Sequence, residues 1–211
     1  MDHIHVLLAE RDSLWKSSVE LCLSEEPDLC LVGTVKTREE LLNAVRSLRI
    51  HVVLMDFPIL EKMSDVMEAV FEIVKAHNSK VIMLSDERRE EWIIESLAHS
   101  VSNFVSKSYL PDIPEAIRAA HRNRSPIHFS SAWAVRNELV RMKMDAWRQQ
   151  LTVTETTVLR LVDQGQSHRQ MAESLFISES TVKKHINHIL KKYRVGSSKE
   201  AARKARMRGV L

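Results

Sequence analysis

The sequence of 211 residues predicts two domains of different fold class. We expect a doubly wound α/β domain with a five-stranded parallel sheet, then a linker helix, then a small all-α domain of four helices. Over the first 121 residues, five short apolar runs alternate with five helical patterns. Four segments with helix-capping residues follow one another from residue 151 onward. Residues 1–121 carry a net charge of −8 and residues 122–211 carry +11, so the charge changes sign between the two parts.

The expected strands are short runs rich in β-branched residues, at 3–9, 29–35, 52–56, 81–85 and 103–106. The expected helices that follow them cover 13–25, 37–47, 64–76, 89–98 and 112–123. Thr37 and Glu40 have the spacing of a capping box, in which each side chain bonds the other residue's backbone N–H. Functional side chains of such a sheet gather at the carboxyl ends of its strands.

Four residues are expected at that edge of the sheet. They are Glu10 after the first strand, Asp56 and Ser85 at the ends of the third and fourth, and Lys107 after the fifth. A carboxylate can accept a phosphoryl group, while hydroxyl and ammonium groups bind the phosphoryl oxygens. The edge therefore indicates phosphoryl chemistry, for which carboxylates usually also hold a divalent cation.

A linker is predicted between the two domains. Residues 122–131 contain Pro126 and are predicted to form a loop. Residues 132–150 mix charges with spaced apolar side chains and predict a helix that packs on one domain or on a second subunit.

The carboxyl-terminal helices each have recognisable ends. Thr152 and Glu155 form a predicted capping box, and Gly165 has the place of a glycine that ends a helix. A short helix is expected at 167–175, then a tight connector, then a helix over 178–192 capped by Ser178. A last helix is expected at 198–208, before Gly209.

The helix at 178–192 sorts its side chains onto two faces. One face is apolar, and the other carries Ser180, Lys183, Lys184, Asn187 and Lys191. Together with the short helix before it, this makes a helix-turn-helix arrangement. Lysines suit DNA phosphates or guanine edges, and asparagine can pair with adenine, so the face suits the major groove of double-stranded DNA. Taken alone, such a face is more often ordinary solvated surface.

Residues 151–211 resemble the DNA-binding domain of the LuxR/NarL type. The matching positions are Leu151, Thr152, Glu155, Val158, Leu159, Gly165, Ser167, Ala172, Leu175, Ser178, Thr181, Val182, Lys183, His185, Ile189, Lys192, Val195 and Ala201. The resemblance implies base contacts by Lys183, Lys184 and Asn187. It implies contacts to the DNA backbone by Ser178, Thr181 and Lys192.

The same resemblance implies a homodimer formed through the last helix, here with Ala201, Ala202 and Ala205. Two positions depart from the family pattern. Thr154 and Ser198 stand where the family usually has arginine. Each change removes a charge, which points to a modest affinity for DNA.

Residues 1–121 resemble a response-regulator receiver domain, which has a flavodoxin-like fold. Asp56 falls on the phosphoacceptor position, and Ser85, Phe104 and Lys107 fall on the switch hydroxyl, switch aromatic and lysine positions. A receiver followed by a LuxR-type domain is the NarL/FixJ architecture. The resemblance therefore implies a transcription regulator, with a sensor kinase or another regulator as a candidate partner.

The receiver departs from its family where magnesium is held. The family has two adjacent acids after the first strand, whereas this chain has Glu10 and Arg11. Arginine cannot ligate a cation, and Mg²⁺ requires oxygen ligands, so we predict a weak or absent metal site and no cofactor. We hypothesise that Arg11 pairs with Asp56 or Glu10 and that Asp56 is phosphorylated poorly or not at all. Alternatively, Arg11 points to solvent and Asp12 completes the site, although Asp12 more simply caps the next helix.

Other features exclude further classes. No apolar run approaches the length of a membrane span, and the first residues lack the pattern of a signal peptide, so we expect a cytoplasmic protein. Cys22 and Cys30 are too few for a disulfide framework and are expected to be reduced and buried. The ten histidines do not have zinc spacing, and four glycines leave no phosphate-binding loop.

Three functions remain after these exclusions: a DNA-binding regulator, a phosphatase or phosphotransferase, and an interaction module that modulates another regulator. A DNA-binding regulator is favoured over a phosphatase or phosphotransferase, because Arg11 argues against a working metal site. Two alternatives stay open for the receiver. It could be a conventional receiver phosphorylated on Asp56 by a sensor kinase, or an interaction module that modulates another regulator.

Overall fold

The computed structural model describes residues 3–57, 62–86 and 89–211. Residues 58–61, where this chain has Pro-Ile-Leu-Glu and the receivers that it resembles usually have a Met-Pro pair after the phosphoacceptor, lie outside the described residues. The chain divides into two compact units, Met1–Arg136 and Asn137–Leu211, each with its own hydrophobic core.

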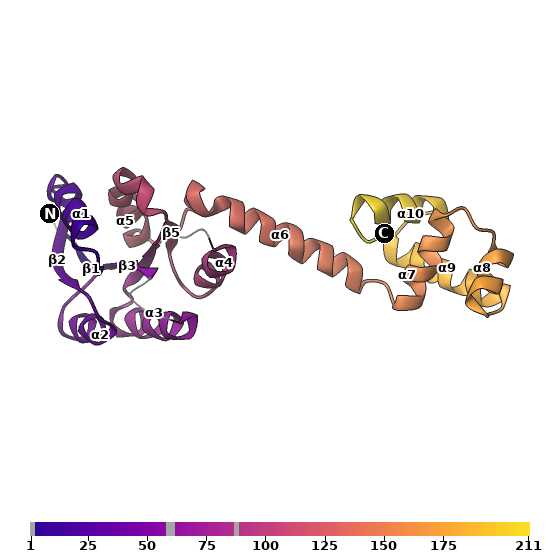
Figure 1. Ribbon diagram of the computed structural model, residues 1–211, viewed down its shortest axis with the longest axis horizontal. Coiled ribbons are helices and arrows are strands. Elements are labelled where there is room, and N and C mark those ends of the chain that lie inside the picture. Colours follow the sequence, from indigo (N-terminus) through magenta and orange to yellow (C-terminus); the bar gives the residue numbers. More distant parts are fainter. Residues whose placement is uncertain (1–2, 58–61, 87–88) are drawn as a thin grey trace. The chain divides into compact units, whose positions relative to one another are not determined.

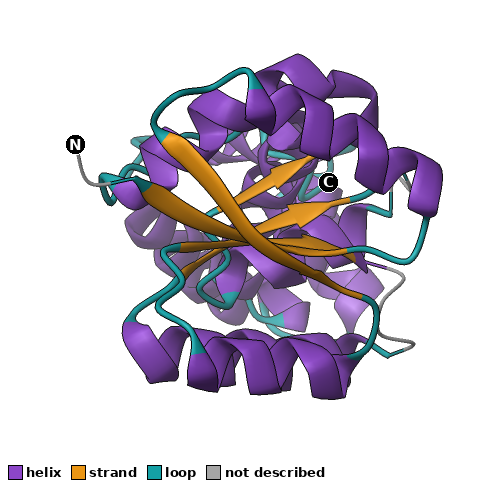
Figure 2. Cartoon of the chain, turned by 90° about the vertical axis from the view of Figure 1, so that its left-hand side faces the viewer, coloured by secondary structure: helices purple, strands orange, loops and turns teal. Residues whose placement is uncertain are grey.

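The first unit is built on the predicted parallel sheet, which lies between layers of helices (Figure 2). Its strands are β1 (Ile4–Ala9), β2 (Leu29–Val35), β3 (Val52–Asp56), β4 (Lys80–Leu84) and β5 (Asn103–Val105), in the order β2-β1-β3-β4-β5. All neighbouring pairs are parallel. The central strands are buried on both faces, which explains why they read as continuous apolar runs in the sequence. Each strand lies within one residue of its predicted bounds.

Helices cover both faces of this sheet (Figure 1). They are α1 (Ser13–Ser24), α2 (Arg38–Ser47), α3 (Met63–His77), α4 (Glu90–Ala98) and α5 (Ile113–His121), with a 3₁₀ helix, η2 (Lys107–Asp112), before α5. Side chains of α2, α3 and α4 share one core with the sheet, and side chains of α1 and α5 share the other. The doubly wound α/β prediction is confirmed.

The linker helix is longer than the sequence predicts. Helix α6 spans Phe129–Gln149, so its first turn covers residues that we expected in a loop. The carbonyl of His128 accepts hydrogen bonds from the N–H groups of Ser131 and Ala132, and contacts of His128 and Ser130 with the receiver hold this turn. Sequence pattern does not reveal such tertiary contacts. The boundary between the two compact units falls within α6.

The second unit contains the four predicted helices. They are α7 (Val153–Asp163), α8 (His168–Leu175), α9 (Glu179–Tyr193) and α10 (Ser198–Met207). Gly165 and Gly209 follow α7 and α10 with φ of +78° and +63°, and the residue after each glycine donates its N–H to a carbonyl of the preceding helix. Both therefore end their helices as predicted, because glycine adopts positive φ without strain.

The capping boxes differ from the prediction at Thr37. The box at Thr152 is closed on both sides, and Ser167 forms another that we had not predicted. Thr37 accepts the N–H of Glu40, but the Glu40 carboxylate accepts from Lys36, one residue further back. The backbone explains this. The φ of the capping residue is −72° at Thr152 and −74° at Ser167, but −131° at Thr37. At this φ, the N–H of Lys36 rather than that of Thr37 points toward the glutamate.

Across the residues that the structure describes, none of the helices has the length and apolarity needed to cross a membrane. Cys22 and Cys30 are free thiols, as predicted, but they are half-buried rather than buried.

Candidate functional site

The first candidate site is the polar face of α9. Ser178 caps the helix, and its hydroxyl accepts the N–H of Thr181 at 3.1 Å. Four side chains of the predicted DNA-binding set lie exposed along the helix, namely Lys183, Lys184, Asn187 and Lys191. Their neighbours on the opposite face, including Val182, Ile186 and Ile189, are buried. The predicted separation of the two faces is confirmed.

The turn before α9 presents this face. Phe176 ends α8 in the left-handed conformation, with φ of +55°, and its side chain is 95% exposed. Ile177 donates its N–H to Ala172 and packs against the core of the second unit. The chain therefore reverses within two residues, and α8 packs directly against α9, as in a helix-turn-helix.

Lys192 differs from the other lysines of α9. Its Nζ lies 2.6 Å from Oε2 of Glu155, whose side chain is only 4% exposed. Burial raises the pKa of Glu155, but hydrogen bonds from Lys192 and Thr152 outweigh burial, so the pKa lies below its usual value. The ammonium thus braces α9 against α7. From the sequence, we assigned Lys192 to the DNA backbone and missed its contact with Glu155. The capping pattern that identifies Glu155 does not reveal a partner 37 residues away.

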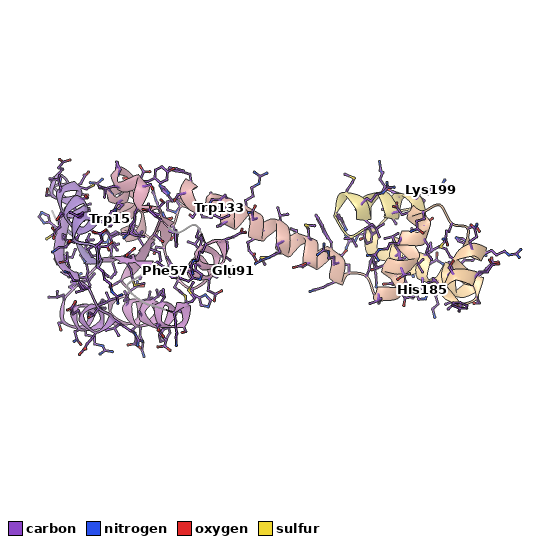
Figure 3. All side chains as sticks on the ribbon, viewed as in Figure 1. Trp15, Phe57, Glu91, Trp133, His185 and Lys199 are labelled. Atoms are coloured by element: carbon purple, nitrogen blue, oxygen red, sulfur yellow. The ribbon has the colours of Figure 1, made fainter. Side chains whose placement is uncertain are left out.

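The predicted dimer residues lie inside the domain instead. Ala201, Ala202 and Ala205 are 0%, 3% and 0% exposed and pack in the core with α7 and α9. A side chain buried in its own domain cannot contact a second copy in this conformation. The prediction that these alanines form a dimer interface is therefore corrected to a core role. The exposed face of α10 carries basic side chains such as Lys199, which is labelled in Figure 3.

The second candidate site is an acidic pocket at the carboxyl edge of the sheet. Lys107 places its Nζ 2.6 Å from Oε2 of Glu10 and 2.8 Å from Oδ1 of Asp56. The bond to Glu10 is a hydrogen bond, whereas the contact to Asp56 is an ion pair without that alignment. The ammonium also lies 4.7 Å from the centre of the Trp15 ring. The sequence correctly placed these two carboxylates and the lysine together.

The charges of the pocket are unbalanced, because two buried carboxylates share one ammonium. The side chains of Glu10 and Asp56 are 0% and 5% exposed. Burial raises the pKa of Asp56 to about 6, with Glu10 raising it further and Lys107 opposing the rise. Burial alone lowers the pKa of Lys107, but the two carboxylates outweigh burial and raise it. The lysine therefore stays charged, and the Asp56 carboxyl holds a proton more readily than an exposed carboxyl does.

The donor groups of this pocket do not fit a magnesium ion. Glu10 uses one oxygen to accept the N–H of Asp12 at 2.8 Å and the other to bind Lys107. Asp12 caps α1, accepting the N–H of Leu14 at 2.8 Å, so it does not replace the missing second acid. In residues 3–57, 62–86 and 89–211, His, Cys, Asp and Glu side chains form no group of three or more suited to a metal. An octahedral oxygen shell would have to displace Lys107 and the cap.

Arg11 does not take the role predicted for it. It is exposed, and its Nε donates to the carbonyl of Lys36 at 3.2 Å, beyond the end of β2. Among the described residues, the cation that lies on Asp56 and Glu10 is Lys107. The hypothesis that Arg11 supplies this charge is therefore corrected.

The two switch positions lie just after β4 and within β5. Ser85 is 4% exposed and donates its N–H to Val105, which joins the end of β4 to β5. Phe104 is 3% exposed and lies in the core with α2, α3 and α4, so its ring points inward. Their roles as receiver switch residues stay predictions.

Asp86 is a residue that sequence reasoning missed. Its Oδ1 accepts three hydrogen bonds, from the hydroxyl of Ser106 at 3.1 Å and from the N–H and hydroxyl of Ser108 at 3.0 and 3.1 Å. These two serines flank Lys107. The loop after β4 is thereby tied to the backbone that carries the ammonium. Adjacent serines and a distant aspartate give no sequence signal of such a contact.

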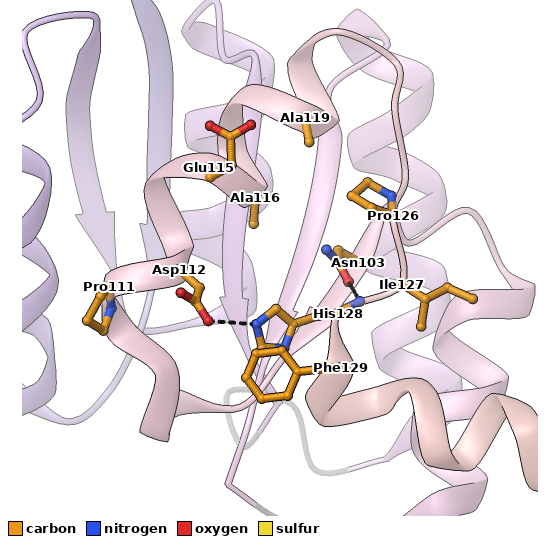
Figure 4. Close-up of a pocket in the computed structure, with 10 residues that line it drawn as sticks. All are labelled: Asn103, Pro111, Asp112, Glu115, Ala116, Ala119, Pro126, Ile127, His128 and Phe129. Carbon is orange, nitrogen blue, oxygen red and sulfur yellow. Dashed lines mark hydrogen bonds and ion pairs between the residues drawn. The ribbon is translucent and has the colours of Figure 1, made fainter.

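The start of α6 is bound to the receiver through His128 (Figure 4). Its ring nitrogens lie 3.0 Å from Asp112 Oδ2 and 2.7 Å from Ser130 Oγ, and its backbone N–H donates to Asn103 at 3.1 Å. Ser130 Oγ also accepts the N–H of Ser106 at 3.1 Å. An open cavity of about 470 Å³ lies beside this contact. Ten residues between Asn103 and Phe129 line it, with Ala116 and Ala119 of α5 on one side.

Comparisons with known proteins show what this chain is similar to. Residues 149–205 match the family model described as bacterial regulatory proteins, luxR family. The chain is 26% identical to the nitrate/nitrite response regulator protein NarL of Escherichia coli over 205 residues, covering 93% of this chain and 92% of that protein. It is 29% identical to the transcriptional regulatory protein LiaR of Bacillus subtilis over 204 residues, covering 94% and 95%.

Solved structures show the same fold. The RcsB response regulator of Salmonella typhimurium matches with a TM-score of 0.59 at 17% identity, covering 98% of this chain and 100% of that one. A structure of two RcsB dimers bound to two parallel DNAs matches with a TM-score of 0.57 at 17% identity, covering 98% and 99%.

Proposed function

We propose that this chain, a response regulator of the NarL type with a receiver domain and a LuxR-type helix-turn-helix domain, controls transcription. It would bind DNA as a homodimer. Its receiver would work without conventional phosphorylation. We propose the domain limits 1–121 for the receiver, 122–150 for the linker and 151–211 for the DNA-binding domain. The observation that carries the proposal is the exposed basic face of α9 over a buried apolar back.

The DNA-binding roles follow from the chemistry of that face. Lys183, Lys184 and Asn187 would reach base edges in the major groove, where asparagine pairs with adenine and lysine with guanine. Ser178, Thr181 and Lys191 would contact phosphates and fix the position of the helix. Lys192 would contribute mainly by holding α9 against α7, because its ammonium is already bound by Glu155.

Fluorescence anisotropy with host DNA fragments tests this proposal. Fragments enriched by immunoprecipitation from the native host supply the specific sequence. Lys183→Ala or Asn187→Ala should cost about 1–3 kcal/mol of binding free energy and relax base choice. Lys199→Ala is the matched control, because it removes a charge from the exposed face of α10, in the same domain but outside the α9 face.

Binding should also weaken steeply with salt, since each phosphate contact adds roughly 0.9 to the slope of log affinity against log salt. Equal affinity for all fragments, with all three variants like wild type, would contradict sequence-specific binding through α9.

The receiver proposal rests on how the acidic pocket is occupied. Phosphorylation of a receiver aspartate requires charge neutralisation around the phosphoryl oxygens, which a divalent cation usually supplies. Here Arg11 stands in place of one acid, Asp12 caps α1, and Lys107 occupies the remaining carboxylates. We therefore expect Asp56 to be a poor phosphoacceptor, and the receiver to respond to a partner or ligand.

Incubation with acetyl phosphate and Mg²⁺, followed by intact mass measurement, tests the receiver. Wild type should gain little or no phosphoryl group. Arg11→Asp restores the second acid at the family position and should increase the phosphorylated fraction, and adding Asp56→Asn should abolish that increase. A near-stoichiometric gain by wild type would instead support the alternative of a conventional receiver served by a sensor kinase.

A further inference from the structure

Helix α6 carries a heptad pattern along its length. Ala132, Val135, Leu139, Met142 and Ala146 recur at alternating spacings of three and four, which is the a and d pattern of a coiled coil. We propose that this seam pairs with the same seam of a second copy, as a parallel two-stranded coiled coil. The proposal deepens the homodimer stated above and rests on it, and it assigns the dimer contact to α6.

The seam is exposed where its largest side chains lie. Leu139 and Met142 are 58% and 59% exposed. Ala134 is buried in the receiver core and Trp147 packs on the core of the DNA-binding domain, so neither is available to a second copy. Trp133 and Val140 are exposed as well, at 37% and 53%, but they lie outside the seam. The seam is thus an exposed apolar stripe of α6 with heptad spacing, available for an intermolecular contact.

Charges beside the seam indicate a second copy in parallel orientation. In a parallel pair, a g residue faces the e residue five positions later on the other helix. Glu138 is at g and Lys143 is at e, so each copy would place its glutamate against the lysine of the other. In the single chain Glu138 contacts Arg141, while no ion pair is recorded for Lys143 among the described residues.

The antiparallel arrangement is disfavoured by the same side chains. It pairs g with g and e with e, which would set Glu138 against Asp145 and Arg136 against Lys143. Both pairs are like-charged and repel. A parallel pair also brings the carboxyl ends of both helices together. Both DNA-binding domains are then attached at the same end of the pair, where they can bind two adjacent half-sites.

The pairing should be weak without DNA. The 21 residues of α6 form only three heptads, about 31 Å long, and two of the three a positions are alanine. Binding to adjacent half-sites raises the effective concentration of the second helix and should stabilise the coiled coil. The dimer is thus expected to depend on concentration in free protein and to persist on DNA with two half-sites.

Disulfide trapping in the full-length protein tests the seam. The native thiols are first removed by Cys22→Ser and Cys30→Ser. Leu139→Cys then places equal residues face to face in a parallel pair, and mild oxidation should give covalent dimers. Val140→Cys is the matched control, because its position is similarly exposed, at 53%, but lies beside the seam. Equal crosslinking of both variants, or no crosslinking by Leu139→Cys on DNA with two half-sites, would overturn the proposal.

Charge variants test the orientation. In the parallel pair Glu138→Lys faces Lys143, so it should raise the dimer dissociation constant about fivefold, and adding Lys143→Glu should restore it. In an antiparallel pair Glu138→Lys would face Asp145 and tighten the dimer, which would overturn the proposal. The readout is the dissociation constant from sedimentation equilibrium.

Failure of this proposal and of DNA binding are distinguishable. Lys183→Ala should lose DNA affinity and keep the crosslink, since it lies outside α6. Leu139→Asp should abolish crosslinking through a cysteine placed at another seam position. It should also remove the preference for DNA with two half-sites over one, while DNA with a single half-site still binds. If Leu139→Asp changes neither dimerisation nor half-site preference, the dimer contact lies elsewhere and the proposal is wrong.

Discussion

The acidic pocket makes the stability of the receiver depend on pH through Asp56. Because the pKa of Asp56 rises from 3.8 to about 6 on folding, the folded state favours the protonated form. A group of this kind contributes stability that is fully present below the unfolded pKa and is lost as pH rises through the folded pKa. Asp56→Asn mimics the protonated carboxyl and should remove this loss.

The size of the effect follows from the shift. A shift of about 2 units corresponds to roughly 3 kcal/mol between low pH and pH 8. About half of that is already lost at pH 5, so the change between pH 5 and pH 8 is about 1–1.5 kcal/mol. The side chain is only 5% exposed, so solvent screening reduces the value little. Asp56→Asn should therefore exceed wild type in stability by about 1–1.5 kcal/mol more at pH 8 than at pH 5.

Urea unfolding of the full-length protein at the two pH values measures this difference. The transition of the DNA-binding domain serves as an internal reference, because Asp56 lies outside that unit. Asp12→Asn is the matched control, since it removes an exposed carboxylate and keeps a capping oxygen on α1. A stability difference between Asp56→Asn and wild type that is the same at both pH values would refute the reasoning, as would a net loss of stability in Asp56→Asn at pH 8.

Three further substitutions test other contacts. Lys107→Met leaves two buried carboxylates without a cation and should lower the unfolding free energy of the receiver by about 3–5 kcal/mol at pH 8, measured by urea unfolding, and less at pH 5. Lys192→Met removes the ammonium from its buried glutamate partner and should destabilise the DNA-binding domain by about 1 kcal/mol in thermal melts; an unchanged midpoint would show that the contact is not stabilising. Gly209→Ala forces a Cβ to positive φ and within 2.6 Å of a methionine methyl, so it should cost about 1–2 kcal/mol in the same melts. Gly196→Ala is its control, because a Cβ there meets nothing within 4 Å, and equal effects of the two would contradict the strain.

Most of the fold could be predicted from local pattern. Strands buried on both faces, such as β3 and β4, read as uninterrupted apolar runs, and helices with a capping residue and a terminal glycine show both ends in the sequence. The first turn of α6 could not be predicted this way. It is held by His128 and Ser130 against β5 and the following turn, and those contacts connect residues more than 20 positions apart.

The candidate sites divide in the same way. The convergence of Glu10, Asp56 and Lys107 follows from topology, since carboxyl ends of parallel strands meet at one edge. Which cation would lie on the carboxylates does not follow from topology, because Arg11 directly follows Glu10 and only the structure shows that its side chain turns to the carbonyl of Lys36. Likewise, the sequence pattern predicts that the three alanines of α10 contact a second copy and that Lys192 contacts DNA. Only the packing shows that these side chains contact other residues of the same chain.

The single oxygen of Asp86 that binds Ser106 and Ser108 has a mechanical consequence. The backbone on either side of Lys107 is fastened to one point, and the N–H of Ser106 is fastened in turn to Ser130 in the opening turn of α6. A displacement of the backbone at Lys107 would therefore have to break these hydrogen bonds or move the first turn of α6 with it.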